Sequence, residues 1–275
     1  MEGDHFDKLE LFEELYPNPN SSKVGAHCID RSTKDKKVKA YNSLYGELIL
    51  AGLSTFMHFL SNECNSSHQV LEQRFTSLSD LGCGIGKLPV LCLLFFPNFK
   101  RLYGIELFRE RFEIGRLVIL TLYQKIKREG VTLLSTHNQV TLTIDDRSLT
   151  IQCGDIYELA NSSCDVYIAD FAFRDESDTQ RFVDFMIGTQ PGAVFLTYES
   201  ISGKDPRLSS DFRVLGVPPL ETTWSHNATF QSFMRIEGKK KRKGVHLYNP
   251  ISKSFRWKSR LRARHLNKMG LSGCK

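Results

Sequence analysis

Short apolar runs alternate with longer amphipathic segments along most of this chain. Apolar runs of four to eight residues between turn residues are typical of buried strands, and apolar residues at intervals of three and four indicate helices. On this basis strands are predicted at residues 74–81, 101–106, 165–169 and 193–198. Helices are predicted at residues 48–60, 87–96, 108–129 and 179–188. The alternation predicts an α/β fold with a doubly wound, mostly parallel sheet.

Two hairpins and one further helix complete the prediction. Residues 140–144 and 148–153 flank an Asp-Asp-Arg turn, which indicates an antiparallel pair. After a Pro-Pro pair, residues around Trp224 and residues 230–236 alternate and predict a closing antiparallel hairpin. At the N-terminus, apolar residues at helical spacing predict a short surface helix over residues 4–16, followed by a polar loop.

The charge of the chain is unevenly distributed. Its 275 residues carry a formal net charge of +6, yet residues 239–275 hold 13 Lys or Arg and no acid. Residues 1–238 therefore carry 24 bases against 31 acids, a net charge of −7. The acidic body ends in a basic tail, residues 239–275, which opens with the run from Lys239 to Lys243. Such runs are typical of solvated faces, of nucleic-acid patches and of nuclear-import signals.

Composition excludes several classes of protein. Hydrophobic residues make up 41% of the chain, enough for a sizeable core, and the absence of an 18-residue apolar run predicts no membrane span. The acidic, amphipathic N-terminus is unlike a secretory signal. The seven cysteines form no C-x-x-C pair, and the eight histidines show no H-E-x-x-H or H-x-H spacing. We therefore expect a reducing compartment, no disulfide framework and no metal.

The motif that most clearly indicates a ligand-binding site is a glycine turn between the first strand and the helix that follows it. This turn, D-x-G-x-G-x-G, runs from Asp80 through Gly82, Gly84 and Gly86. Missing side chains let backbone N–H groups approach a ligand closely. Glu106 ends the next strand twenty residues past the last glycine, where a carboxylate accepts hydrogen bonds from a ribose diol. Together these features predict a nucleoside-binding site.

The acid at the head of the turn narrows the choice of ligand. A dinucleotide fold has a third glycine or an alanine where this chain has Lys87. Asp80 instead suits a ligand with an ammonium group in place of pyrophosphate. S-adenosylmethionine is such a ligand, because it has a ribose at one end and a methionyl ammonium at the other. We therefore expect S-adenosylmethionine as the cofactor.

All four candidate motifs fall at the carboxyl ends of predicted strands. They are the glycine turn, Glu106, residues 154–156 and residues 170–173. Ligands of doubly wound sheets bind outside these ends. The motifs are therefore expected to line one crevice.

Taken together, the motifs resemble those of one enzyme family. Tyr45-Gly46-Glu47, the glycine turn, Tyr103-Gly104-Ile105-Glu106, Gly154-Asp155 and Phe171-Ala172-Phe173 occur in this order over residues 40–237. The chain is similar to the disruptor-of-telomeric-silencing methyltransferases, the non-SET enzymes that methylate a lysine in the globular core of histone H3, and resembles their compact protist members. The resemblance implies a seven-stranded class I methyltransferase fold. It also implies a catalytic domain over residues 45–237, between an N-terminal segment (1–44) and a C-terminal tail (238–275).

The resemblance also implies which residues hold the cofactor. Asp80 would bind the methionyl ammonium, Glu106 the ribose hydroxyls and Asp155 the adenine amino group. Tyr45 would lie near the methionyl carboxylate in a loop over the cofactor, close to the reacting atoms. Glu47 would stand beside it, although an acid at a helix start is also favoured by the helix dipole alone.

A second set of residues would receive the substrate. By the resemblance, Phe171, Phe173 and Trp224 would line a hydrophobic channel for the lysine. A dry channel disfavours the ammonium form, so it supplies a neutral amine without a strong base. Asp170 could accept a proton or hold the arriving ammonium, or it could simply cap a turn.

The chain departs from the family pattern at several positions. The family's glutamine after the glycine turn is Lys87 here, and its adenine-stacking aromatic residue is Ile156. Its Asn-Asn pair before F-A-F is Ala169-Asp170, and its paired tyrosines are Phe230-Gln231.

Three functions follow from these patterns. The first is a nuclear histone-lysine methyltransferase that binds nucleosomes, with the basic tail holding DNA. The second is a nucleic-acid amino-methyltransferase, because residues 170–173 stand where such enzymes have Asp/Asn-Pro-Pro-aromatic, although both prolines are missing. The third is a cofactor-binding scaffold on chromatin without catalysis.

Overall fold

The computed structural model describes residues 7–17, 48–64, 75–160, 163–170, 175–223 and 225–237. The basic tail and five predicted site residues lie outside these ranges, namely Tyr45, Glu47, Phe171, Phe173 and Trp224. Within the described ranges, the predicted alternation of strands and helices is confirmed.

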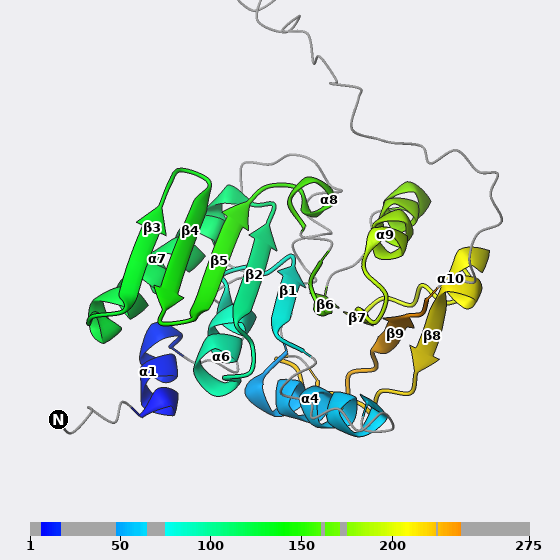
Figure 1. Ribbon diagram of the computed structural model, residues 1–275, viewed down its shortest axis with the longest axis horizontal. Helices are drawn as coiled ribbons and strands as arrows, with labels where there is room; N and C mark the ends of the chain where they lie inside the picture. The colour runs from blue at the N-terminus through cyan, green and yellow to red at the C-terminus, as the bar shows by residue number, and fades with distance from the viewer. Residues whose placement is uncertain are drawn as a thin grey trace, which may run out of the picture. The chain divides into compact units, whose positions relative to one another are not determined.

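The described strands form one sheet of nine (Figure 1). Five strands run parallel, namely β1 (Ser77–Leu81), β2 (Arg101–Glu106), β5 (Arg147–Cys153), β6 (Val166–Ala169) and β7 (Val194–Thr197). Four are antiparallel to their neighbours, namely β3 (Val131–Ser135), β4 (Gln139–Ile144), β8 (Phe212–Leu215) and β9 (Gln231–Arg235). The order across the sheet is β3-β4-β5-β2-β1-β6-β7-β9-β8.

The direction in which the chain adds parallel strands reverses beside β1. After β1 the chain adds β2 and then β5 on one side, and it later adds β6 and β7 on the other side. Right-handed crossovers place the connecting helices on opposite faces before and after such a reversal. Ligands of doubly wound sheets bind at the carboxyl ends of the strands that flank it, which here are β1 and β6.

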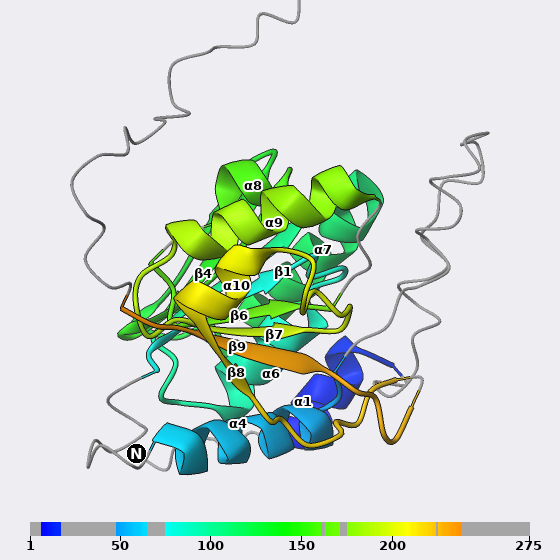
Figure 2. The ribbon, with the colours of Figure 1, turned by 90° about the vertical axis from the view of Figure 1, so that its right-hand side faces the viewer.

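Helices cover both faces of the sheet (Figure 2). One face carries α1 (Lys8–Leu15), α4 (Leu50–Cys64), α6 (Lys87–Phe95) and α7 (Arg109–Ile126), whose apolar side chains share one core cluster. The other face carries α8 (Ile156–Leu159), α9 (Glu176–Gly188) and α10 (Pro206–Asp211), which pack into a second cluster. Figure 2 shows α4 and α9 on opposite sides of the strands. Among the described helices, none has the length and apolar character needed to cross a membrane.

These features confirm the predicted fold class. The seven strands β5-β2-β1-β6-β7-β9-β8 form the doubly wound, mostly parallel sheet of the class I methyltransferase fold, closed by an antiparallel hairpin. The β3–β4 pair extends the β5 edge, which brings the described strands to nine rather than seven. The predicted pairing of residues 140–144 with 148–153 is confirmed as β4 with β5.

One strand of the closing hairpin was predicted in the wrong place. The partner of β9 is β8, whereas the described residues around position 224 contribute two isolated bridges, between Leu220 and Ala228 and between Thr222 and Leu48. In β8 only the two end residues, Phe212 and Leu215, are buried. Because β8 lacks the alternation of buried and exposed positions that marks a strand, its sequence does not reveal it.

The N-terminal helix packs one of its sides against the core of the protein. In and just after α1, Leu11, Phe12, Leu15 and Tyr16 are all buried. Residues at spacings of one and four form a stripe down one side of a helix, and this stripe packs against the face that carries α6 and α7. The predicted helix is confirmed, with its acids Glu10, Glu13 and Glu14 exposed. The sequence did not show which surface its apolar stripe covers.

Asp165 joins the amino ends of β1 and β6, on the opposite edge of the sheet from the predicted site. One of its carboxylate oxygens accepts from the N–H and hydroxyl groups of both Thr76 and Ser77, at 2.8–3.2 Å. The other oxygen accepts from Gln190 Nε2 at 3.1 Å. Losing this acceptor would leave several partly buried donors without a partner.

We expect Asp165→Ala to lower the free energy of unfolding by about 2 kcal/mol or more, measured by urea denaturation. The matched control is Asp146→Ala, which removes an exposed acid paired with Lys100 at the surface and should barely move the midpoint. Equal midpoints for the two variants would contradict this account of Asp165.

Candidate functional site

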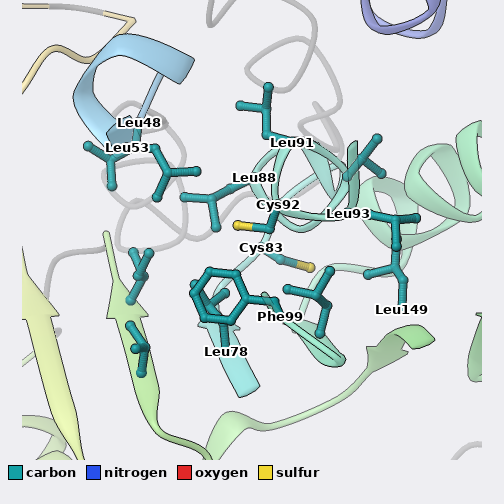
Figure 3. Close-up of a cluster of buried hydrophobic side chains, with 14 of the residues drawn as sticks. Leu48, Leu53, Leu78, Cys83, Leu88, Leu91, Cys92, Leu93, Phe99 and Leu149 are labelled. Carbon is teal, nitrogen blue, oxygen red and sulfur yellow. The ribbon is translucent and has the colours of Figure 1, made fainter. Parts of the chain in front are cut away.

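The glycine turn connects β1 directly to α6. Gly82, Gly84 and Gly86 have φ angles of 86°, 56° and 78°, in the left-handed region that residues with a Cβ rarely adopt. The residues between them, Cys83 and Ile85, are 4% and 2% exposed. Figure 3 shows Cys83 among apolar side chains of β1 and α6. The glycines thus supply the backbone conformation, and the two buried side chains anchor the turn in the core.

Glu106, at the end of β2, binds the turn directly. Its side chain is nearly fully buried, and Oε2 accepts from the N–H of Gly84 at 2.8 Å while Oε1 accepts from the N–H of Phe108 at 2.7 Å. Burial raises the pKa of Glu106, and the hydrogen bond from Phe108 and the charge of Arg111 oppose this rise. Each carboxylate oxygen has a second lone pair. The carboxylate therefore retains the capacity to accept two adjacent hydroxyls.

The N–H groups of the turn are directed at protein acceptors. The carbonyl of Ile105 accepts from Gly82 at 2.8 Å and from Cys83 at 2.9 Å, and Gly86 donates to the carbonyl of Cys83 at 2.8 Å. Together with the bond from Gly84 to Glu106, these contacts hold the turn against β2. These four N–H groups are therefore not the ligand donors that the sequence led us to expect.

Two glycines outside the turn let neighbouring elements approach it. A Cβ at Gly104 of β2 would lie 2.8 Å from Sγ of Cys83, and one at Gly115 of α7 would lie 3.0 Å from the carbonyl oxygen of Ile85. The hydroxyl of Tyr16, at the end of α1, donates to that same oxygen at 3.3 Å. Sequence reasoning assigned no role to Gly115 or Tyr16. A glycine inside a helix was the available signal for Gly115, whereas no local pattern marks Tyr16.

Asp80 and Lys87 stand on either side of the turn, and both are buried. Asp80 lies near the carboxyl end of β1, two residues after Leu78 of the larger core cluster, so the two share the face that carries α6. Burial raises the pKa of the Cys92 thiol in α6, and the charge of Asp80 raises it further. Lys87 is the first residue of α6. Both residues therefore lie beside the turn.

Asp155 follows β5 and caps α8. Its Oδ1 accepts from the N–H of Tyr157 at 2.9 Å, and its Oδ2 accepts from Nη2 of Arg181 in α9 at 3.1 Å. The Arg181 guanidinium lies 4.1 Å from the centroid of the Tyr157 ring. The predicted cofactor residue Ile156 begins α8 and is half-buried. Sequence reasoning missed Arg181, which comes from a different helix.

The four predicted acids that the structure describes lie along one edge of the sheet. The adjacent strands β5, β2, β1 and β6 each carry one at or near the carboxyl end, in the order Asp155, Glu106, Asp80 and Asp170. Asp170 follows β6 directly and is half-buried. Strands are spaced by about 4.8 Å, so four of them span roughly 14 Å. This row suits an elongated ligand with several separate polar groups. Within the described ranges, no group of three or more His, Cys, Asp or Glu is placed to hold a metal ion.

Comparisons with known proteins add the following. No protein-family model matches the chain, and no curated protein is significantly similar to it in sequence. Among solved structures it is similar to a putative O-methyltransferase from Klebsiella pneumoniae, with 10% identity and a TM-score of 0.45 over 82% of this chain and 90% of that chain. It is also similar to magnesium protoporphyrin IX methyltransferase from Synechocystis PCC 6803, with 11% identity and a TM-score of 0.43 over 78% and 95% of the two chains. These values are too low for a conclusion about function.

The turn should tolerate a side chain at Gly86 poorly, and two glycines allow a matched test. Gly86 and Gly203 have φ angles of 78° and 77°, but a Cβ at Gly86 would lie 2.4 Å from Cδ1 of Ile151, whereas one at Gly203 meets nothing within 4 Å. Gly203→Ala should lower the free energy of unfolding by about 1–2 kcal/mol from the backbone alone. Gly86→Ala should lower the free energy of unfolding by clearly more than this, measured by urea denaturation. Equal losses for the two variants would contradict the prediction, because they would show that neighbouring atoms shift to accept the added Cβ.

Proposed function

We propose that this chain is an S-adenosylmethionine-dependent methyltransferase that modifies a lysine in the globular core of histone H3 within nucleosomes. The observation that carries the cofactor is the order of the four acids along the carboxyl edge of the sheet, Asp155, Glu106, Asp80 and Asp170. S-adenosylmethionine has adenine, ribose and methionyl groups in a line, with the transferable methyl next to them. The acids follow that same order.

The chemistry of each acid fits the group opposite it. Asp155 would accept from the adenine amino group. Glu106, which accepts from the N–H groups of Gly84 and Phe108, would also accept from the ribose hydroxyls. Asp80, on the next strand, would attract the methionyl ammonium, with Tyr45 and Glu47 closing over this end. When bound, the sulfonium supplies an electrophilic methyl group.

Methyl transfer to an amine requires alignment and a neutral nucleophile. The amine must stand in line with the methyl group and the sulfur, and an ordinary lysine has a pKa of about 10.4. Phe171, Phe173 and Trp224 would form a dry wall that disfavours the ammonium. Asp170 directly follows β6, the strand next to β1, and would accept a hydrogen bond from the arriving amine. These groups would orient the lysine and keep water away from it.

The substrate proposal rests on charge. The body of the chain, residues 1–238, has a net charge of −7 and would be repelled by DNA, whereas the basic tail has 13 bases. A lysine in the folded core of a histone is presented beside wrapped DNA, and a basic tail binds DNA of any sequence by releasing counterions. A short peptide substrate would need no such tail. We therefore propose that the protein acts in the nucleus, on nucleosomes.

The affinity for S-adenosylhomocysteine should depend on pH through Glu106. The ionised carboxylate accepts ribose hydroxyls, whereas the protonated form loses part of that capacity. Burial raises the pKa of Glu106. As the pH is lowered, the affinity measured by calorimetry should therefore begin to fall at a higher pH than the value of about 4.3 near which an ordinary glutamate titrates. Glu106→Gln should bind roughly tenfold more weakly at neutral pH, a loss of about 1.4 kcal/mol, and should show no such fall. Glu110→Gln, an exposed acid of α7, is the control and should keep the wild-type profile.

One incubation separates the three candidate functions. The protein is mixed with radiolabelled S-adenosylmethionine and, separately, with nucleosomes, free histones or RNA. Label on nucleosomal histone H3, far above that on free H3, supports the proposal. Label on RNA would establish a nucleic-acid methyltransferase instead, and cofactor binding without label on any substrate would establish a scaffold.

Deleting residues 239–275 tests the role of the basic tail. The deletion should abolish most nucleosome binding and flatten its dependence on salt, because fewer counterions are released. Affinity for the cofactor should not change, since the four acids precede the tail. The proposal is contradicted if activity on nucleosomes equals activity on a free H3 peptide and the deletion changes neither. An import signal would then be the remaining role for the tail.

A further inference from the structure

The helix that follows Asp155 depends on its neighbours for its position. α8 has four residues, Ile156–Leu159, and a single helical turn is not stable in isolation. Asp155 caps it with one carboxylate oxygen. The direction of the other oxygen is therefore set by contacts from outside α8.

α9 provides those contacts from a rigid base. It has 13 residues, and its side chains Phe182, Val183 and Met186 are fully buried in the second core cluster. From this helix Arg181 reaches Oδ2 of Asp155 at 3.1 Å, and its guanidinium lies 4.1 Å from the centroid of the Tyr157 ring. A guanidinium that stacks on a ring and pairs with a carboxylate has little freedom of orientation.

Tyr157 closes the connection between the two helices. Its hydroxyl donates to the carbonyl oxygen of Asp178 at 3.0 Å, one turn before Arg181 in α9. Burial raises the pKa of Tyr157, and the charge of Asp178 adds to the rise, so the hydroxyl stays protonated and remains a donor. Asp155, Arg181 and Tyr157 thus form a closed ring of contacts, and the hydroxyl of Tyr157 ties this ring to Asp178.

This ring contributes more to orientation than to stability. The side chains of Arg181 and Asp155 are 45% and 32% exposed, and ion pairs at such exposure add little to the free energy of unfolding. The ring fixes the orientation of the Asp155 carboxylate, which stands at one end of the row of acids. An ionised carboxylate only accepts hydrogen bonds. It therefore favours a base that presents an amino group and disfavours one that presents a carbonyl oxygen.

We infer that Arg181 is a positioning residue that aims Asp155 at the amino group of the base, and so makes the site select adenine over hypoxanthine. The inference rests on the proposed function, because it assumes that the nucleoside lies along the row of acids. Ile156 supplies no aromatic platform, so selection at this end depends on the directed carboxylate.

The test compares two ligands, S-adenosylhomocysteine and S-inosylhomocysteine. The base of the first has an amino group where the base of the second has a carbonyl oxygen. Calorimetry is carried out on the full chain as wild type, Arg181→Ala and Arg181→Lys. We expect the wild type to prefer the adenine ligand about tenfold or more. Arg181→Ala should reduce that preference to near unity, mainly by weakening the adenine ligand, and Arg181→Lys should restore it only in part.

Arg128→Ala is the matched control, because Arg128 also forms an exposed ion pair, with Asp145 at 2.7 Å. It should keep the wild-type preference, and all variants should have similar melting temperatures. An undiminished preference in Arg181→Ala would overturn the role of Arg181 and leave the cofactor proposal intact. Failure of the wild type to bind either ligand would instead overturn the proposed function and this inference with it.

Discussion

The hydrogen bond from the N–H of Gly84 to the carboxylate of Glu106 is the contact on which the arrangement of the site depends. It joins the carboxyl ends of β1 and β2, and it presents a buried acid one strand away from the reversal between β1 and β6. A buried carboxylate is costly unless hydrogen bonds compensate it, and here two backbone N–H groups do so. The glycine turn thus supports the buried acid.

The acids at the amino ends and at the carboxyl ends of the strands have different surroundings. Asp165 and Asp170 flank the same strand, β6, yet they meet different surroundings. At the amino edge, Asp165 is surrounded by donors of the protein itself. At the carboxyl edge, Asp170 belongs to a row of four acids, two of which have a cation nearby, Arg181 at Asp155 and Arg111 at Glu106. The proposed methyltransferase would use the second edge without disturbing the first.

Strands β6 and β7 could be predicted from the sequence because they are buried on both faces and read as nearly continuous apolar runs. β2 has polar residues among its apolar ones, yet it was predicted at its observed bounds, and the acid that ends it could be located with it. β3 and β8 were missed, because an edge strand buries too few side chains to leave a pattern. The docking of α1 was missed as well, since an amphipathic helix does not reveal the surface that it covers.

By itself the sequence determined the glycine turn, the acids at the strand ends and the basic tail, because each is a property of neighbouring residues. Only the tertiary structure decided where the N–H groups of the turn point and which residues support it. Tyr16 reaches Ile85 across 69 positions of the chain, and Arg181 reaches Asp155 across 26. Such contacts arise from the packing of whole elements, which leaves no periodic trace in the residues that meet.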